Sequence, residues 1–151
     1  MKKYELTTNT KMHFGHKLFQ IKALISFGNV EKGDIGGWIE KEENLDQEGD
    51  AWVYGNAEVY GNAEVCGDAW VCGDADYLTI RGIGSRYATT TVTRTKDGVI
   101  QVACGCFFGT LEEFKAQVEE THGDSNFAKE YELFCQIIEL HFGGLKDDRQ
   151  T

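Results

Sequence analysis

The segment RGIGSR, from Arg81 to Arg86, places two glycines, a hydroxyl group and two guanidinium groups close together. Backbone N–H groups at glycine-rich turns and paired guanidinium groups both bind phosphate oxygens. Arg81, Ser85, Arg86 and the nearby Arg94 are therefore candidates for binding an anion or a nucleotide. The alternative is an ordinary connection between strands, whose arginines pair with acidic residues elsewhere in the chain.

Cys104 and Cys106 are a second group of residues that could bind a ligand, because both would face the same side of a strand. With His122 or His141 these thiols have the ligand types that zinc prefers. The alternative is that both cysteines are small core residues, and we favour it because the spacing lacks a second clear pair. We therefore expect no metal site and no cofactor.

The charge of the chain is strongly acidic and unevenly distributed. The formal net charge is -10, and residues 33–80 contain twelve acidic residues against one lysine. A polyanion is attracted by clustered Lys and Arg, so we expect no direct binding to nucleic acid. We also expect no membrane segment, because no apolar stretch approaches the length that spans a bilayer and the first residues are not those of a signal peptide.

Hexapeptide repeats occupy the centre of the sequence. Five of them run from Gly49 to Leu78 as GDAWVY, GNAEVY, GNAEVC, GDAWVC and GDADYL, and two looser units extend the phase back to Gly37. In each unit a short strand would point an Ala and a β-branched residue inward, because side chains alternate along a strand. Gly followed by Asn or Asp would supply the turn.

The pairs Val53 with Ala57, Val59 with Ala63, and Val65 with Ala69 carry a resemblance to the hexapeptide-repeat family. The resemblance implies a mainly β fold, a short left-handed parallel β-helix with three hexads per coil, and frequently a trimer. We expect a homo-oligomer, as a trimer or dimer.

The flanking segments predict the rest of the organisation. Residues 1–36 are expected to form an irregular β cap, and residues 79–144 a C-terminal α+β domain with a β-hairpin and two helices. Thr110 and Glu113 form a capping box that opens the first helix. Gly143 and Gly144 are expected to end the second, and residues 145–151 to form a flexible tail.

Residues eighteen apart should stack in such a coil. Trp52 would then lie above Trp70, and these two with Tyr54 are candidates for an oligomer or partner contact, unless the rest of the same chain covers them. The other two faces would be acidic. Candidate partner-binding residues on them are Glu58, Tyr60, Glu64 and Asp76.

Acyltransferases of the hexapeptide-repeat family use a histidine beside the coils as the base that activates the acceptor. This chain has no histidine between His16 and His122. That absence disfavours acyl transfer on the family pattern, and we expect the protein not to be an enzyme.

The segments GHKLFQIKAL, GGWIEKEENL and CGCFFGTLEEF are similar to those of small uncharacterised proteins of bacteriophages and prophages. That resemblance implies an accessory role in the cytoplasm of an infected or lysogenic bacterium. The leading hypothesis is a non-enzymatic, counter-defence (anti-CRISPR-like) inhibitor whose acidic faces bind a basic, nucleic-acid-handling host protein. The alternatives are a sponge that sequesters a nucleotide immune signal through residues 81–86, and an acyltransferase-like enzyme.

Overall fold

The computed structural model describes residues 2–73, 76–83, 89–105 and 107–150, with the backbone alone at 144–150. The chain divides into two compact units, Met1–Tyr77 and Leu78–Thr151. Each unit has its own cluster of buried hydrophobic residues. The division therefore places the N-terminal segment and the repeats in one unit.

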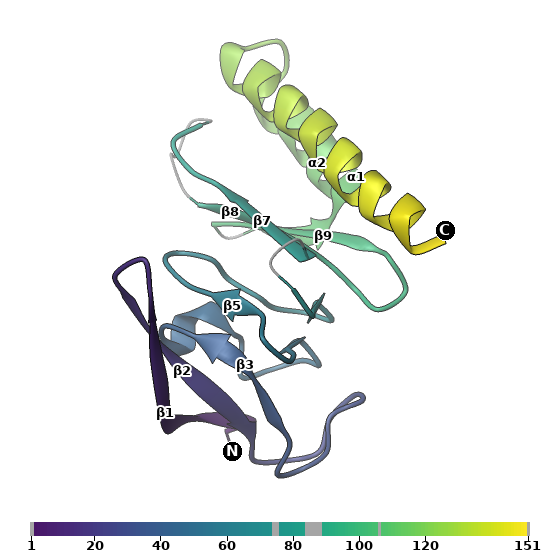
Figure 1. The fold of residues 1–151 in the computed structure, drawn as a ribbon. Coiled ribbons are helices and arrows are strands. Elements are labelled where there is room, and N and C mark those ends of the chain that lie inside the picture. Colours follow the sequence, from purple (N-terminus) through teal and green to yellow (C-terminus); the bar gives the residue numbers. More distant parts are fainter. Residues whose placement is uncertain (1, 74–75, 84–88, 106, 151) are drawn as a thin grey trace. The chain divides into compact units, whose positions relative to one another are not determined.

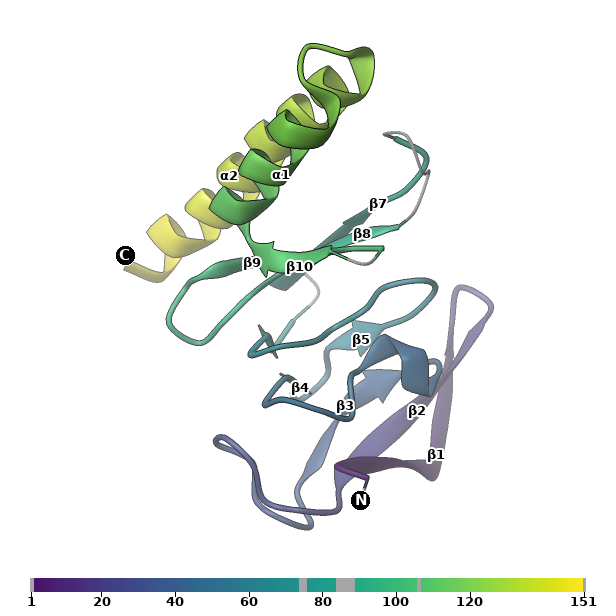
Figure 2. The same ribbon diagram turned by 180° about the vertical axis from the view of Figure 1, so that it is seen from behind.

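The first unit is built from two sheets. Its strands are β1 (Tyr4–His13), β2 (His16–Ala23), β3 (Ile35–Ile39), β4 (Trp52–Val53), β5 (Glu58–Val59) and β6 (Trp70–Val71), with a 3₁₀ helix at Glu42–Asn44. One sheet has the order β1-β2-β3-β5 (Figures 1 and 2), and β4 pairs with β6 in the other. Within the first sheet, β1 pairs with β2 and β2 with β3 in antiparallel fashion, and β3 pairs with β5 in parallel.

The predicted fold class, a mainly β protein with a left-handed parallel β-helix, is wrong. The structure contains several separate sheets and two helices, and its longer strand pairs are antiparallel. Among the described residues, β3 pairs with β5 and β4 with β6 in parallel, and Leu45 forms a parallel bridge with Val65. Within the described part of the chain, each of the five hexads from Gly49 to Leu78 supplies at most two strand residues. The longer N-terminal strands make more hydrogen bonds and therefore dominate the main sheet.

Two local features of the repeats were nevertheless predicted correctly. Trp52 pairs with Trp70 in parallel, as the spacing of eighteen requires. The small and β-branched residues of the hexads point inward and are buried: Ala51, Val53, Ala57, Val59, Ala63, Val65, Ala69 and Val71. The alternation of side chains along each short strand therefore holds, although the repeats do not set the fold of the unit.

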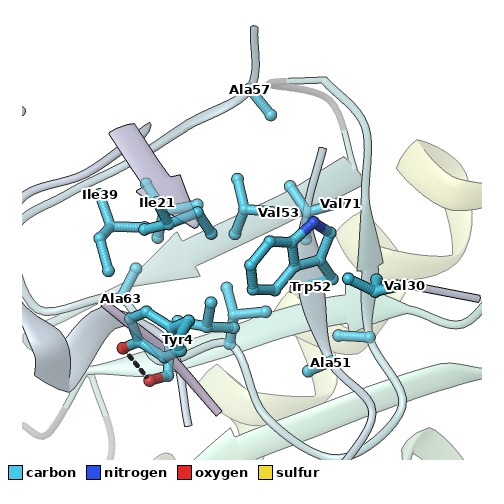
Figure 3. Packing of buried hydrophobic residues seen from close by; sticks show 14 of the residues in the cluster. Tyr4, Ile21, Val30, Ile39, Ala51, Trp52, Val53, Ala57, Ala63 and Val71 are labelled. Carbon is cyan, nitrogen blue, oxygen red and sulfur yellow. Dashed lines mark hydrogen bonds between the residues drawn. The ribbon is translucent and has the colours of Figure 1, made fainter. Parts of the chain in front are cut away.

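The core of the first unit is centred on Trp52, whose exposed fraction is 1% (Figure 3). Tyr4 and Phe27 approach the indole edge-on, with ring centroids at 6.2 and 5.3 Å. The Tyr4 hydroxyl donates a hydrogen bond of 2.6 Å to the carbonyl oxygen of Leu45. The N-terminal segment thus covers Trp52, which the sequence analysis proposed as a candidate contact for a partner.

Gly37 lies where two backbone segments of the first unit approach closely. A Cβ added there would be 2.7 Å from the carbonyl oxygen of Ala57 and 2.8 Å from Cγ1 of Val53. We expect Gly37→Ala to lower the free energy of unfolding by about 1–3 kcal/mol, because the packed backbone must move. Urea unfolding followed by circular dichroism measures this. Gly73→Ala, where a Cβ meets nothing within 4 Å, is the control and should change stability little.

A buried lysine predicts a pH dependence of stability. Lys3 is 1% exposed, and its ammonium donates to the carbonyl oxygens of Ala51 at 2.8 Å and Gly49 at 3.3 Å. Burial lowers the pKa of Lys3 from 10.5 to about 8, against the opposing attraction of Asp46 and Asp50. Between these two pH values the unfolded chain holds a proton that the folded chain has lost, so this lysine makes stability rise with pH.

Unfolding free energies at pH 7.5 and pH 9.5 test this expectation. The wild-type protein should gain roughly 1–2 kcal/mol relative to Lys3→Met over this interval. Burial also raises the pKa values of Tyr4 and of Cys66, and these groups act in the opposite direction. They are present in both proteins, so the difference isolates Lys3. If the unfolding free energy changes equally with pH in the two proteins, Lys3 is not the cause of the pH dependence.

The second unit is a sheet covered by a helical pair. Its elements are β7 (Tyr77–Ile80), β8 (Thr90–Arg94), β9 (Ile100–Cys104), β10 (Phe107–Thr110), α1 (Leu111–His122) and α2 (Asn126–Gln150). The sheet order is β10-β9-β8-β7, and α1 and α2 lie side by side on one of its faces (Figures 1 and 2). The core includes Val92 and Val102 from the sheet and Phe114, Phe134 and Ile138 from the helices.

The start of the first helix and the hairpin of this unit were predicted correctly, but the end of the second helix was not. Thr110 and Glu113 form the capping box, and β8 and β9 pair as the predicted antiparallel hairpin. Helix α2 continues through Gly143 and Gly144 to Gln150, so the predicted end at these glycines is wrong. It takes in most of the segment predicted as a flexible tail. No helix among the described residues is both long and apolar enough to cross a membrane.

Candidate functional site

The tip of the β1–β2 hairpin carries two histidines. The loop consists of Phe14 and Gly15, whose φ angles of 48° and 83° are both positive. Two-residue loops with this backbone place the flanking residues opposite each other across the hairpin. His13 and His16 are accordingly register partners. The sequence HFGH at residues 13–16 thus holds two imidazoles together in space.

Side chains of the hairpin tip reach across the sheet. Two strands, β2 and β3, separate β1 from β5, which corresponds to roughly 14 Å in a flat sheet at the usual strand spacing. Nevertheless, Nζ of Lys11 on β1 lies 2.9 Å from Oε2 of Glu58 on β5. The register shifts between Leu6 and Thr10 and between Gln20 and Lys22 mark the irregularities at which the strands can bend.

His16 and Glu40 form the first half of the site. Nδ1 of His16 lies 2.8 Å from Oε2 of Glu40, and the backbone N–H of Gly61 donates to Oε1 of the same carboxylate at 2.8 Å. The hydrogen bond from His16, followed by that from Gly61, holds the pKa of Glu40 below its usual value. A carboxylate only accepts hydrogen bonds, so Nδ1 carries the proton and Nε2 of a neutral His16 has a free lone pair.

Glu58 anchors the second half. Its side chain is 12% exposed and contacts Lys11 through Oε2 and Nδ1 of His13 through Oε1, the latter at 3.4 Å. The ring of Tyr60 packs against both imidazoles, with centroids 4.8 Å from His16 and 5.5 Å from His13. Two imidazoles, two carboxylates, a phenol and an ammonium group are therefore gathered on one face of the first unit.

This arrangement has the parts of a general base. An imidazole takes up a proton near neutral pH, and a carboxylate on its other nitrogen fixes the ring orientation and tautomer. His16 and Glu40 have this relationship. Both imidazole side chains remain about one-third exposed, so a ligand can reach them. The sequence analysis did not reveal this site, because the histidines lie outside the repeats. The available local signal was a glycine between two histidines, within the segment predicted as an irregular β cap.

The four predicted partner-binding residues do not share one acidic surface. Glu58 and Tyr60 belong to the histidine cluster. Asp76 is 3% exposed and its Oδ2 accepts the backbone N–H groups of Cys72 and Gly73. Glu64 is exposed and lines a different hollow, of about 420 Å³, together with Glu42, Glu43 and Asp46. Three of the four therefore have roles within the chain.

The predicted aromatic contact surface is also divided. Trp52 is buried by its own chain, so it is not available to a partner. Trp70 and Tyr54 are partly exposed, and their rings pack edge-on at 5.7 Å. The sequence analysis gave coverage by the rest of the same chain as the alternative to a partner contact, and Trp52 is covered in this way. The hairpin and the segment around Phe27 provide that cover.

The predicted anion-binding residues are only partly described. Ser85 and Arg86 lie outside the described residues, Arg81 is exposed, and Arg94 on β8 is 7% exposed. Cys106 also lies outside them, and Sγ of Cys104 accepts a hydrogen bond from Thr90 Oγ1 at 3.1 Å. Within the part of the chain that the structure describes, no group of three or more His, Cys, Asp or Glu side chains is placed to hold a metal ion.

Comparison with known proteins gives one short match. No family model matches the chain. Over 37 residues the chain is 49% identical to the "Uncharacterized acetyltransferase YdcK" of Escherichia coli (strain K12), which covers 24% of this chain and 11% of that protein. The matched part is thus about a tenth of the length of that relative. The match hints at the acetyltransferase resemblance and does not support the bacteriophage resemblance.

Proposed function

We propose that this protein transfers an acyl group from a thioester to an amine or hydroxyl acceptor, with His16 as the general base. The observation that carries the proposal is the contact of 2.8 Å between Nδ1 of His16 and Oε2 of Glu40. This contact leaves Nε2 of the imidazole to take the proton of the acceptor. Glu40 is a positioning residue, because it acts through the imidazole.

The reaction balances with these groups alone. The acceptor nitrogen or oxygen attacks the carbonyl carbon of the thioester as its proton passes to Nε2 of His16, and the C–S bond then breaks. The sulfur leaves with the bonding electron pair and takes the proton from the imidazolium. The products are the acylated acceptor and a free thiol, and His16 returns to its neutral form.

Two further observations support acyl transfer. The relative matched over 37 residues is described as an acetyltransferase, which makes acetyl the first acyl group to test. The absence of histidine from the repeats disfavoured this function. An imidazole nevertheless lies beside the repeats. Tyr60 lies in a repeat and packs against His16, which the hairpin contributes. The base thus comes from outside the repeats.

The experiment is an assay with acetyl-coenzyme A and panels of small amines and alcohols. Release of the free thiol is followed with a colorimetric thiol reagent, and the acetylated product is identified by mass spectrometry. We expect thiol release that depends on the acceptor and yields equal amounts of product. Thiol release at the same rate without any acceptor, or none with every acceptor, would overturn the proposal.

The earlier hypotheses remain predictions. A counter-defence inhibitor would use exposed acidic residues, and of the four residues predicted for it Glu64 is the one that is clearly exposed. A nucleotide sponge would depend on residues 81–86, of which 84–86 lie outside the described residues. Neither hypothesis has an arrangement of side chains comparable to that of His16 and Glu40 in its support.

A further inference from the structure

The ammonium group of Lys11 occupies a defined position in the histidine cluster. Nζ lies 4.5 Å from the centre of the Trp38 ring and 2.9 Å from Oε2 of Glu58. Trp38 and Glu58 are register partners in the parallel pair β3–β5, so the ring and the carboxylate are direct neighbours. An aromatic face and a carboxylate both attract a cation, and together they form a surface suited to a primary ammonium group.

We propose that Trp38 and Glu58 form a subsite for one ammonium group of an aliphatic diamine, and that Lys11 occupies this subsite in the free protein. The inference rests on the proposed acyl transfer and names its acceptor. One amine of the acceptor is anchored between Trp38 and Glu58, and the other is presented to His16. The anchored amine keeps its charge, whereas the reacting amine enters in its neutral form and gives one proton to the imidazole as it attacks the thioester.

The displacement of Lys11 by a ligand is inexpensive. The side chain of Lys11 is 36% exposed, so its ammonium group can return to water, and the ammonium group of the ligand takes over the contact with the largely buried Glu58. Lys11 therefore acts as a competitor tethered to the same chain. A competitor of this kind reduces the apparent affinity by the fraction of time that it fills the subsite. Removing it should increase the affinity for the diamine.

The same cluster disfavours acceptors without an ammonium group. Glu58 has one oxygen directed to Lys11 and the other to His13, and its side chain is largely buried. Displacing Lys11 with a neutral hydroxyl would leave this carboxylate without its cationic partner, whereas a second ammonium group restores the charge balance. The subsite therefore favours a positively charged group. The apolar part of the ligand can pack against the face of Trp38.

Isothermal titration calorimetry with 1,4-diaminobutane, without any thioester, tests the subsite. We expect the wild-type protein to bind the diamine and not to bind 1,4-butanediol. Lys11→Met should bind about threefold to fivefold more tightly, since the tethered competitor is gone. Glu58→Gln and Trp38→Leu should each bind at least about tenfold more weakly. Lys17→Met is the matched control, because Lys17 lies over Phe19, at 5.5 Å, and should leave binding unchanged.

The outcomes separate the subsite from the reaction. Circular dichroism establishes that each variant is folded. If Lys11→Met binds the diamine no more tightly than the wild type, or if Glu58→Gln binds it equally well, the subsite proposal is overturned. If binding follows the expected order but acetyl is never transferred, the subsite stands and the acyl transfer falls. If acetyl is transferred to alcohols with no response to these variants, the subsite falls and the acyl transfer stands.

Discussion

Replacing His16 with Gln is expected to reduce kcat for acyl transfer by about 10²- to 10⁴-fold, which is the usual contribution of a general base. Gln has a similar volume and can still donate a hydrogen bond to Glu40, but its amide does not take up a proton near neutral pH. Because the change affects proton transfer and not the binding surface, KM should change little. Steady-state rates of thiol release over a range of acceptor concentrations measure both constants.

The controls distinguish a chemical role of His16 from a structural one. His122→Gln makes the same replacement on α1, in the other unit, and should leave kcat unchanged. Glu40→Gln removes the carboxylate that orients the imidazole and should lower kcat by less than the loss of the imidazole itself. A loss in His16→Gln that appears wholly as a higher KM would argue against a base. So would a kcat equal to that of the wild type.

Replacing Trp52 with Ala is expected to lower the free energy of unfolding of the first unit by about 3–5 kcal/mol. The indole is 1% exposed and is enclosed by Tyr4, Phe27 and its own sheet neighbours, so its removal leaves a large cavity. The aromatic contacts are lost as well. Urea unfolding followed by far-ultraviolet circular dichroism measures the change without depending on tryptophan fluorescence.

Trp70→Ala is the matched control for this prediction. Trp70 pairs with Trp52 in the register of the repeats, but its side chain is partly exposed. It should therefore cost clearly less stability than Trp52→Ala, and Trp52→Phe should fall between the wild type and Trp52→Ala. Equal losses at the two tryptophans would mean that burial by the N-terminal segment contributes nothing. Such a result would remove the physical account of this core.

The sequence was informative where structure depends on neighbouring residues. The alternation of small and β-branched residues correctly identified Ala51 and Val53 as inward. The capping box correctly placed the start of α1, because Thr110 and Glu113 bond to each other's backbone. In both cases the decisive interactions are made within a few positions of the residues themselves. Such interactions are visible in a single sequence.

The parts that could not be predicted depend on distant residues. The repeats alone suggested regular coils, but β2 pairs with β3 in antiparallel fashion and competes for the same sheet. Nothing local specifies that choice of partner. The site has the same character, since His16 and Glu40 are 24 residues apart and come together only through the sheet. The course of α2 through Gly143 shows the converse, that a local helix-ending signal can be overridden.

The contacts of Glu40 with the hairpin and with the repeats have a consequence for the order of folding. Glu40 contacts His16 across 24 residues and Gly61 across 21, so both contacts require closure of long segments of chain. Local contacts, such as those at the turn of residues 13–16, form earlier and faster than contacts between residues far apart in the sequence. The site should consequently form late, after the hairpin has packed against the repeats. Partly folded chains should already contain the turn at residues 13–16 and yet lack activity.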